Sequence, residues 1–81
     1  MRKTLDQLQP SEQGRIVRVS GSGPVRRRMG DMGLTPGTLI EVIRAAPFRD
    51  PIEFRVRGYN LSLRKNEAAD VEVDVEVEVT S

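Results

Sequence analysis

The chain of 81 residues contains no cysteine and no histidine. The absence of cysteine excludes disulfides and thiolate metal sites, and the absence of histidine removes the commonest general base and transition-metal ligand. No apolar run approaches the roughly 20 residues that span a bilayer, and the first ten residues lack the apolar region of a signal peptide. We therefore expect one small cytoplasmic domain, without catalytic residues, metal ligands or a cofactor.

Aromatic residues are also scarce, since the chain has only two Phe, one Tyr and no Trp. Charge is abundant but uneven, and the formal net charge of +1 hides this. Residues 1–65 hold all 13 Lys and Arg against 6 acidic residues, whereas residues 66–81 hold 6 acidic residues and no basic one. A basic body permits nucleic-acid binding. The few aromatics and the acidic tail disfavour it, because bases would find no stacking platform and phosphates would be repelled.

Alternating apolar and charged residues predict several short strands. Ile52, Phe54 and Val56 alternate with charged residues, and the following Gly58-Tyr59 fits the two-residue loop of a type II′ hairpin. Similar runs occur at "GRIVRV", "TLIEVI" and "VEVDVEVEV". Such strands, separated by turn signals about every ten residues, predict a mainly β fold: a small, strongly bent barrel with one or two short helices.

The stretch "GPVRRRMGDMGLTPGT" predicts a helix followed by a turn. Gly23-Pro24 suits a helix start, and Val25, Met29 and Met32 recur as one apolar stripe. Gly33 stands where a left-handed C-cap is needed, and Pro36-Gly37 fits a type II turn. We expect Met29, Met32 and Leu34 in the core, with an exposed recognition patch as the alternative.

Three consecutive arginines fall in or near the first turn of this helix, where the helix dipole disfavours cations by roughly 0.3–1 kcal/mol each. They could form a solvated face, with Arg28 lying over the edge of the core and Arg27 in reach of Asp31. They could also form a docking face for an acidic partner surface. The candidate partner-binding residues are Arg26, Arg27, Arg28, Asp31 and Leu34.

The acidic C-terminal segment invites a metal site, because hard cations prefer carboxylates. Alternate residues on one strand lie about 6.6–6.8 Å apart, however, which is too far for a compact cage. We interpret these charges as protection of an exposed strand edge. A strand from Val71 to Val79 would be about 30 Å long, more than a small barrel covers. We therefore divide the chain into a barrel of residues 1–75 and an acidic extension of residues 76–81, with a homo-oligomer through the C-terminal strand as one option.

An ordered set of short motifs covers most of the chain. It comprises Arg28-Met29, Met32-Gly33-Leu34, Pro36-Gly37, Ala46-Pro47, Asp50-Pro51-Ile52, Leu61-Ser62-Leu63-Arg64, Glu67-Ala68, Val71 and Val73. In this order and spacing the set resembles the FeoA family of small SH3-like barrels. Gly30, inside the helix, and Arg49, before the Asp-Pro pair, depart from the family pattern.

The resemblance implies a non-enzymatic accessory protein of ferrous iron uptake. Its implied partner is FeoB, a membrane permease with a GTPase domain, so contact with the membrane would come only through that partner. The same barrel occurs as the C-terminal domain of iron-dependent repressors. A stand-alone relative of that domain and a nucleic-acid-binding basic barrel therefore remain alternatives.

Overall fold

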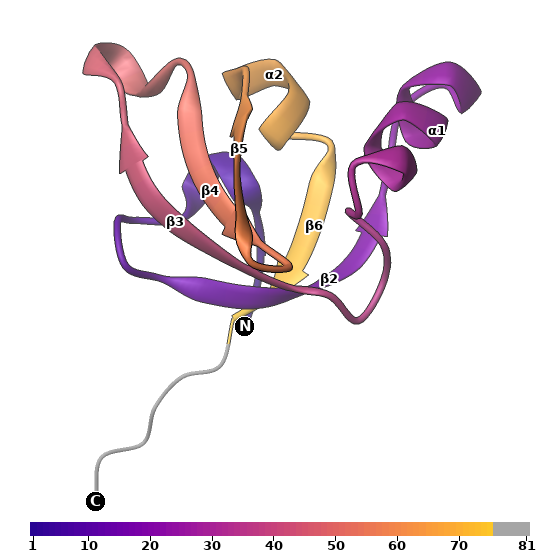
Figure 1. Cartoon of the computed structure of the whole chain (residues 1–81), viewed down its shortest axis with the longest axis horizontal. Coiled ribbons are helices and arrows are strands. Elements are labelled where there is room, and N and C mark those ends of the chain that lie inside the picture. Colours follow the sequence, from indigo (N-terminus) through magenta and orange to yellow (C-terminus); the bar gives the residue numbers. More distant parts are fainter. Residues whose placement is uncertain (76–81) are drawn as a thin grey trace, which may run out of the picture.

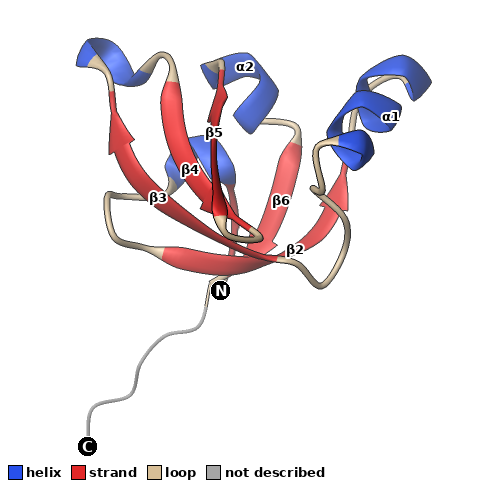
Figure 2. Ribbon diagram, in the orientation of Figure 1, coloured by secondary structure: helices blue, strands red, loops and turns tan. Residues whose placement is uncertain are grey.

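The computed structural model describes residues 1–75, and this part of the chain forms six strands, two α-helices and two 3₁₀ turns (Figure 2). In chain order these are β1 (Arg2–Thr4), η1 (Leu5–Gln7), β2 (Gln13–Val19), α1 (Gly23–Asp31), β3 (Leu39–Ala45), η2 (Pro47–Arg49), β4 (Ile52–Val56), β5 (Tyr59–Leu63), α2 (Lys65–Ala68) and β6 (Val71–Asp74). The expected mainly β fold with short helices is confirmed.

The strands form one antiparallel sheet in the order β1-β6-β2-β3-β4-β5. Its two longest members, β2 and β3, curve strongly (Figure 1). Each of them carries a register shift, between Ile16 and Arg18 in β2 and between Val42 and Arg44 in β3. Such irregularities bend a strand and increase its twist, which lets six short strands wrap around one core.

The core lies inside the curved sheet and is closed by α1, α2 and η1. It contains the apolar residues predicted by alternation and by the helical stripe, with Met29 and Leu34 fully buried and Val25 and Met32 packed at its margin. Its buried members are Leu5, Leu8, Ile16, Met29, Leu34, Ile40, Val42, Ile52, Phe54, Val56, Leu63, Ala68, Val71, Val73 and Val75.

The β4–β5 hairpin turns one residue earlier than predicted. Its loop is Arg57-Gly58, and both residues have positive φ, of 50° and 82°, which is the pattern of a type I′ turn rather than type II′. This register places Ile52 opposite Leu63. A Gly58-Tyr59 loop would instead set Ile52 against a charged lysine, so the packing of the inner face selects the observed turn.

Asp50 ties the β3–β4 loop to α2. Its Oδ1 accepts a hydrogen bond from the backbone N–H of Lys65 at 3.0 Å, and its carboxylate pairs with Arg64. The Arg64 N–H donates to Glu67 Oε1 at 2.8 Å. Helix α2 thus begins at Lys65, with Arg64 at its N-cap position.

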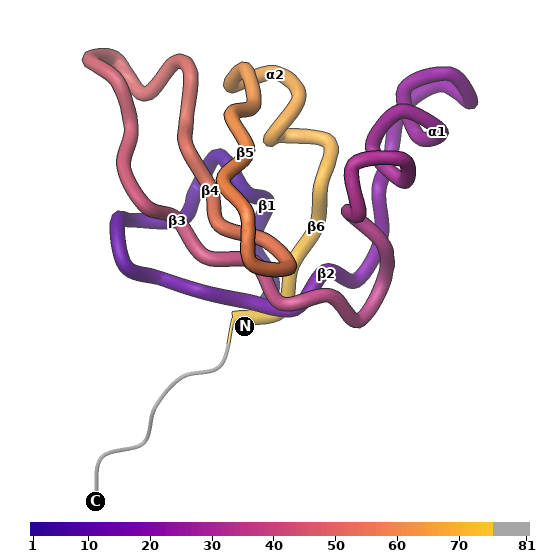
Figure 3. Tube along the Cα trace, viewed as in Figure 1, coloured from indigo at the N-terminus to yellow at the C-terminus, as the bar shows by residue number. Residues whose placement is uncertain are grey.

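The first and last described strands lie side by side, with β1 paired to β6 (Figure 3). The Val75 N–H donates to the Met1 carbonyl at 2.8 Å. The predicted strand over 71–79 therefore exists at least from Val71 to Asp74. The rest of that strand, the proposed extension 76–81 and an oligomeric contact through them lie outside the described residues.

Close to β1, Glu12 shapes the turn that leads into β2. Its Oε1 accepts the Gln9 N–H at 2.6 Å, and its Oε2 lies 3.5 Å from Lys3 Nζ. The hydrogen bond from Gln9, helped by the charge of Lys3, lowers the pKa of Glu12. Within residues 1–75, neither helix is long and apolar enough to cross a membrane.

Candidate docking surface on helix α1

Helix α1 begins and ends as its sequence predicts. Pro24 lies in the first turn, and the N–H groups of Gly33 and Leu34 donate to Gly30 O at 2.9 Å and to Met29 O at 3.0 Å. These two bonds form a Schellman motif, which needs a left-handed residue at its turn. Gly33 supplies it with a φ of 87°. The helix is therefore closed firmly at its C-terminal end.

At the N-terminal end of α1, neither a capping side chain nor an acidic residue stabilises the helix. The side chain of Ser22, at the N-cap position, makes no capping hydrogen bond, and the first turn contains no acidic residue. Arg26 and Arg27 follow at once, and both are exposed and form no ion pair within residues 1–75. Two uncompensated cations thus stand at the positive end of the helix dipole.

The remaining candidate residues separate into different roles. Arg28 forms an ion pair with Glu67 and so connects α1 to α2, a pairing that no local pattern predicts. Asp31 is exposed, and the predicted reach of Arg27 to Asp31 gives no ion pair in the described structure. Leu34 has only 1% of its surface exposed. It lies in the core, as one of the two expectations for this residue had it, and its side chain is therefore not exposed on the α1 surface.

Two side chains of the β4–β5 hairpin hold the loop after α1. The Arg57 guanidinium donates to Gly33 O at 3.3 Å and to the hydroxyls of Thr35 and Thr38 at 3.1 and 2.9 Å. The Tyr59 hydroxyl donates to the Met32 carbonyl. Sequence patterns place Arg57 and Tyr59 near a turn but not against α1, because the contact joins residues about 25 positions apart.

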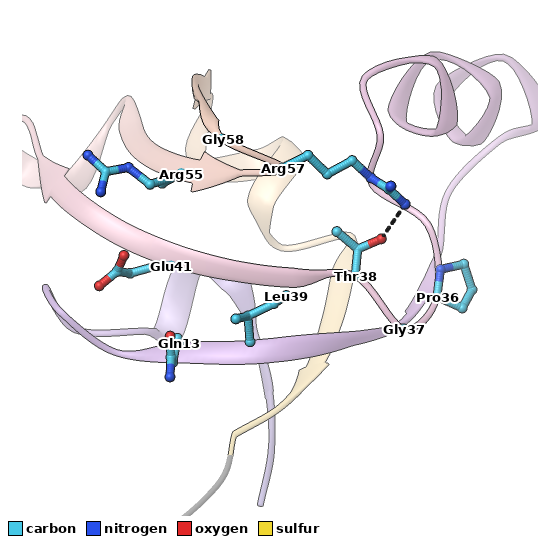
Figure 4. Close-up of a pocket in the computed structure, with 9 residues that line it drawn as sticks. All are labelled: Gln13, Pro36, Gly37, Thr38, Leu39, Glu41, Arg55, Arg57 and Gly58. Carbon is cyan, nitrogen blue, oxygen red and sulfur yellow. Dashed lines mark hydrogen bonds between the residues drawn. The ribbon is translucent and has the colours of Figure 1, made fainter.

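Next to this brace, the outer face of the sheet has an open hollow of about 580 Å³ (Figure 4). Arg57 points across it to Thr38, and Glu41 and Arg55 lie on neighbouring strands beside Leu39. Glu41 and Arg55 face each other in register but form no ion pair among the described residues. The hollow combines one apolar side chain with mixed charge, without a converging set of catalytic groups.

No part of residues 1–75 gathers three or more carboxylates closely enough to hold a metal ion. The acidic residues within this part are instead distributed over separate ion pairs. For example, Glu72 pairs with Arg2 and Arg18, and Glu53 pairs with Arg44. Among the described residues, the exposed Arg26 and Arg27 on α1 remain the candidate site.

Comparison with known proteins identifies the fold and its relatives. The FeoA domain family model matches residues 3–75. An Fe(2+) transport protein A/Fe(2+) transporter FeoB fusion protein from Porphyromonas gingivalis is 44% identical over 71 residues. That match covers 88% of this chain but only 8% of the fusion protein, so the chain corresponds to a small part of that relative.

Solved structures agree with this result. The NMR structure of a FeoA-like protein from Clostridium acetobutylicum is 38% identical, with a TM-score of 0.87 over 99% of this chain and 93% of that one. The zinc complex of Stenotrophomonas maltophilia FeoA, described as a prokaryotic SH3 domain protein, has a TM-score of 0.78 over 89% of both chains. At 24% identity this second likeness concerns the fold alone, which is the predicted SH3-like barrel.

Proposed function

Because this chain belongs to the FeoA family, we propose that it docks on the cytoplasmic part of a FeoB-like permease and modulates Fe(II) uptake. Family membership and the fused relative support an accessory role in ferrous iron transport. The family consists of accessory domains associated with transport and is not a known enzyme family. In this proposal the chain works on the cytoplasmic side, without catalytic residues, and meets the membrane only through its partner.

The observation that carries the docking surface is the pair Arg26 and Arg27. Their charges do not stabilise α1, and they are not paired within the described residues. An acidic surface of the permease would supply the missing counter-charge and would also interact favourably with the helix dipole. Asp31 and the paired Arg28 would lie at the margin of this contact.

The test is binding of the purified chain to the soluble cytoplasmic part of the permease, measured by isothermal titration. Arg26→Gln with Arg27→Gln should weaken binding by about tenfold, which is the loss of 1.4 kcal/mol. Arg15→Gln with Arg55→Gln is the matched control, because it removes the same charge from the outer face of the sheet. Equal affinity of the wild type and the α1 variant would overturn the assignment of the surface.

The same purified chain can be used to test nucleic-acid binding, which is the main alternative suggested by the composition. If phosphate contacts drive binding, the logarithm of the binding constant should fall steeply and linearly with the logarithm of the salt concentration. We expect no such association with duplex DNA or single-stranded RNA. A steep salt dependence without binding to the permease would favour the nucleic-acid alternative instead.

A further inference from the structure

The loop between β3 and β4 exposes a large aromatic side chain. Phe48 has 95% of its surface accessible, more than any other large apolar residue within the described part of the chain. Apart from the N-terminal Met1, the next most exposed large apolar residues are Leu39 and Tyr59, with 43% and 41% of their surface accessible. Single half-exposed apolar residues are common on protein surfaces. A fully exposed phenylalanine, however, contributes no hydrophobic burial energy to folding.

This loop holds Phe48 in a defined position. Phe48 and Arg49 both have positive φ, of 66° and 60°, a conformation that non-glycine residues keep only when their surroundings fix it. The Arg49 guanidinium donates to the carbonyls of Leu8 and Asp6, the latter at 3.2 Å. The Arg49 N–H donates to Ala46 O at 2.8 Å. The aromatic ring therefore projects from a braced tip.

The tip shares one end of the molecule with both helices. In Figure 1, η2, α2 and the beginning of α1 lie at the same end of the barrel, opposite the N-terminus and the end of β6. Residues 44–53 and 64–67 contain four cations and three carboxylates. Arg44 pairs with Glu53 and Arg64 with Asp50, which leaves Arg49 and Lys65 as the cations of this part without an ion pair among the described residues. Lys65 is exposed and forms no ion pair in the described structure.

We propose that Phe48 inserts into an apolar pocket with an acidic rim on the cytoplasmic part of the ferrous iron permease. This is a second contact beside Arg26 and Arg27, and it rests on the docking function proposed above. A single projecting aromatic ring on a loop with an excess of positive charge is complementary to such a pocket, and aromatic anchors in pockets supply much of the energy of protein interfaces. Full burial of the ring corresponds to about 10- to 100-fold in affinity.

A lipid surface is a poorer match to the same residues. Even a whole myristoyl chain gives only marginal membrane binding, and one phenylalanine buries less apolar surface than that chain. A small protein interface, by contrast, suffices where the partner is held at high local concentration. In the fusion protein from Porphyromonas gingivalis, transport protein A and the transporter FeoB are parts of one chain, which gives such a high local concentration.

The experiment compares Phe48→Ser, Phe48→Leu and the control Leu39→Ser for binding to the soluble cytoplasmic part of the permease. Phe48→Ser should lose about 10- to 100-fold in affinity, and Phe48→Leu should stay within about threefold of the wild type. The control removes an exposed apolar side chain from another face and should leave affinity unchanged. Thermal melts of the three variants confirm that each is folded.

The outcomes separate the two proposals. Wild-type binding that Phe48→Ser does not weaken overturns this inference and leaves the docking function intact. Absence of wild-type binding overturns both. Sedimentation with permease-free vesicles of phosphatidylcholine and phosphatidylserine gives a further outcome. If these vesicles bind the wild type but not Phe48→Ser, Phe48 contacts lipid and the pocket assignment is wrong.

Discussion

The two helices of this barrel are stabilised from opposite ends. The N-terminus of α2 is satisfied by the carboxylates of Asp50 and Glu67, although the helix has only four residues. The nine-residue α1 has no such cap, and Arg26 and Arg27 lie near its N-terminus. Its order comes from its C-terminal motif and from Met29 in the core. The N-terminal N–H groups of α2 thus find side-chain acceptors within the chain, whereas the Ser22 side chain provides none for α1.

The largest expected effect comes from detaching α1 from the core. Met29→Ala should lower the free energy of unfolding by about 2–5 kcal/mol, since it leaves a cavity under the one fully buried residue of the helix. Urea denaturation measures this value. Met32→Ala, at the margin of the core, should lower the free energy of unfolding by clearly less than Met29→Ala does. A loss below about 1 kcal/mol for Met29→Ala would show that the core does not hold α1.

Removing the cap of α2 should come next in size. Asp50→Ala deletes the acceptor of the Lys65 N–H and the partner of Arg64, so we expect a loss of about 0.5–2 kcal/mol in chemical denaturation. Asp31→Ala is the matched control, because this exposed carboxylate forms no ion pair with described residues. If both variants lose equally, the capping role of Asp50 is wrong.

A gain in stability should follow from improving α1 itself. Gly30→Ala places a methyl group in open space within the helix and should raise the free energy of unfolding by about 0.5–1 kcal/mol. Gly33→Ala should do the reverse, because its φ is 87° and the added carbon would lie 3.1 Å from Arg57 Cδ. Thermal unfolding of the two variants should therefore shift in opposite directions. A shift in the same direction would contradict the assigned end of α1.

The smallest effect concerns the ion pair that joins the helices. Arg28→Gln removes the partner of Glu67 from an exposed position and should lower stability by about 0.2–1 kcal/mol at low salt. The difference from the wild type should vanish near 1 M salt, where exposed charges are screened. Denaturation at both salt concentrations checks this. A loss that salt leaves unchanged would mean that Arg28 acts through packing.

Local sequence patterns were sufficient for the parts of the fold that depend on nearby residues. The stripe of Val25, Met29 and Met32, the left-handed Gly33 and the alternation in β4 all follow from periodicity or from a single backbone requirement. The turn at Arg57-Gly58 was missed because two neighbouring registers both keep one apolar face. Only the pairing of Ile52 with Leu63 distinguishes them.

Of the candidate site, the exposed Arg26 and Arg27 could be predicted from the sequence, whereas the contacts between distant residues around it could not. Arg28 meets Glu67, and Asp50 meets the backbone of Lys65, across loops that no local pattern specifies. Pro47 and Pro51 flank Phe48, and prolines at such positions favour a loop. An apolar residue between such turn signals is the one hint that its side chain is exposed, but the brace from Arg49 to Leu8 becomes evident only in three dimensions.

The adjacency of β1 and β6 has a consequence for how this barrel can be carried by a larger protein. Met1 and Val75 are hydrogen-bonded neighbours at the pole opposite the helices. A polypeptide joined before Met1 or after Val75 would meet the barrel at that pole. We expect such a fusion to leave the pole that carries η2, α2 and the beginning of α1 accessible.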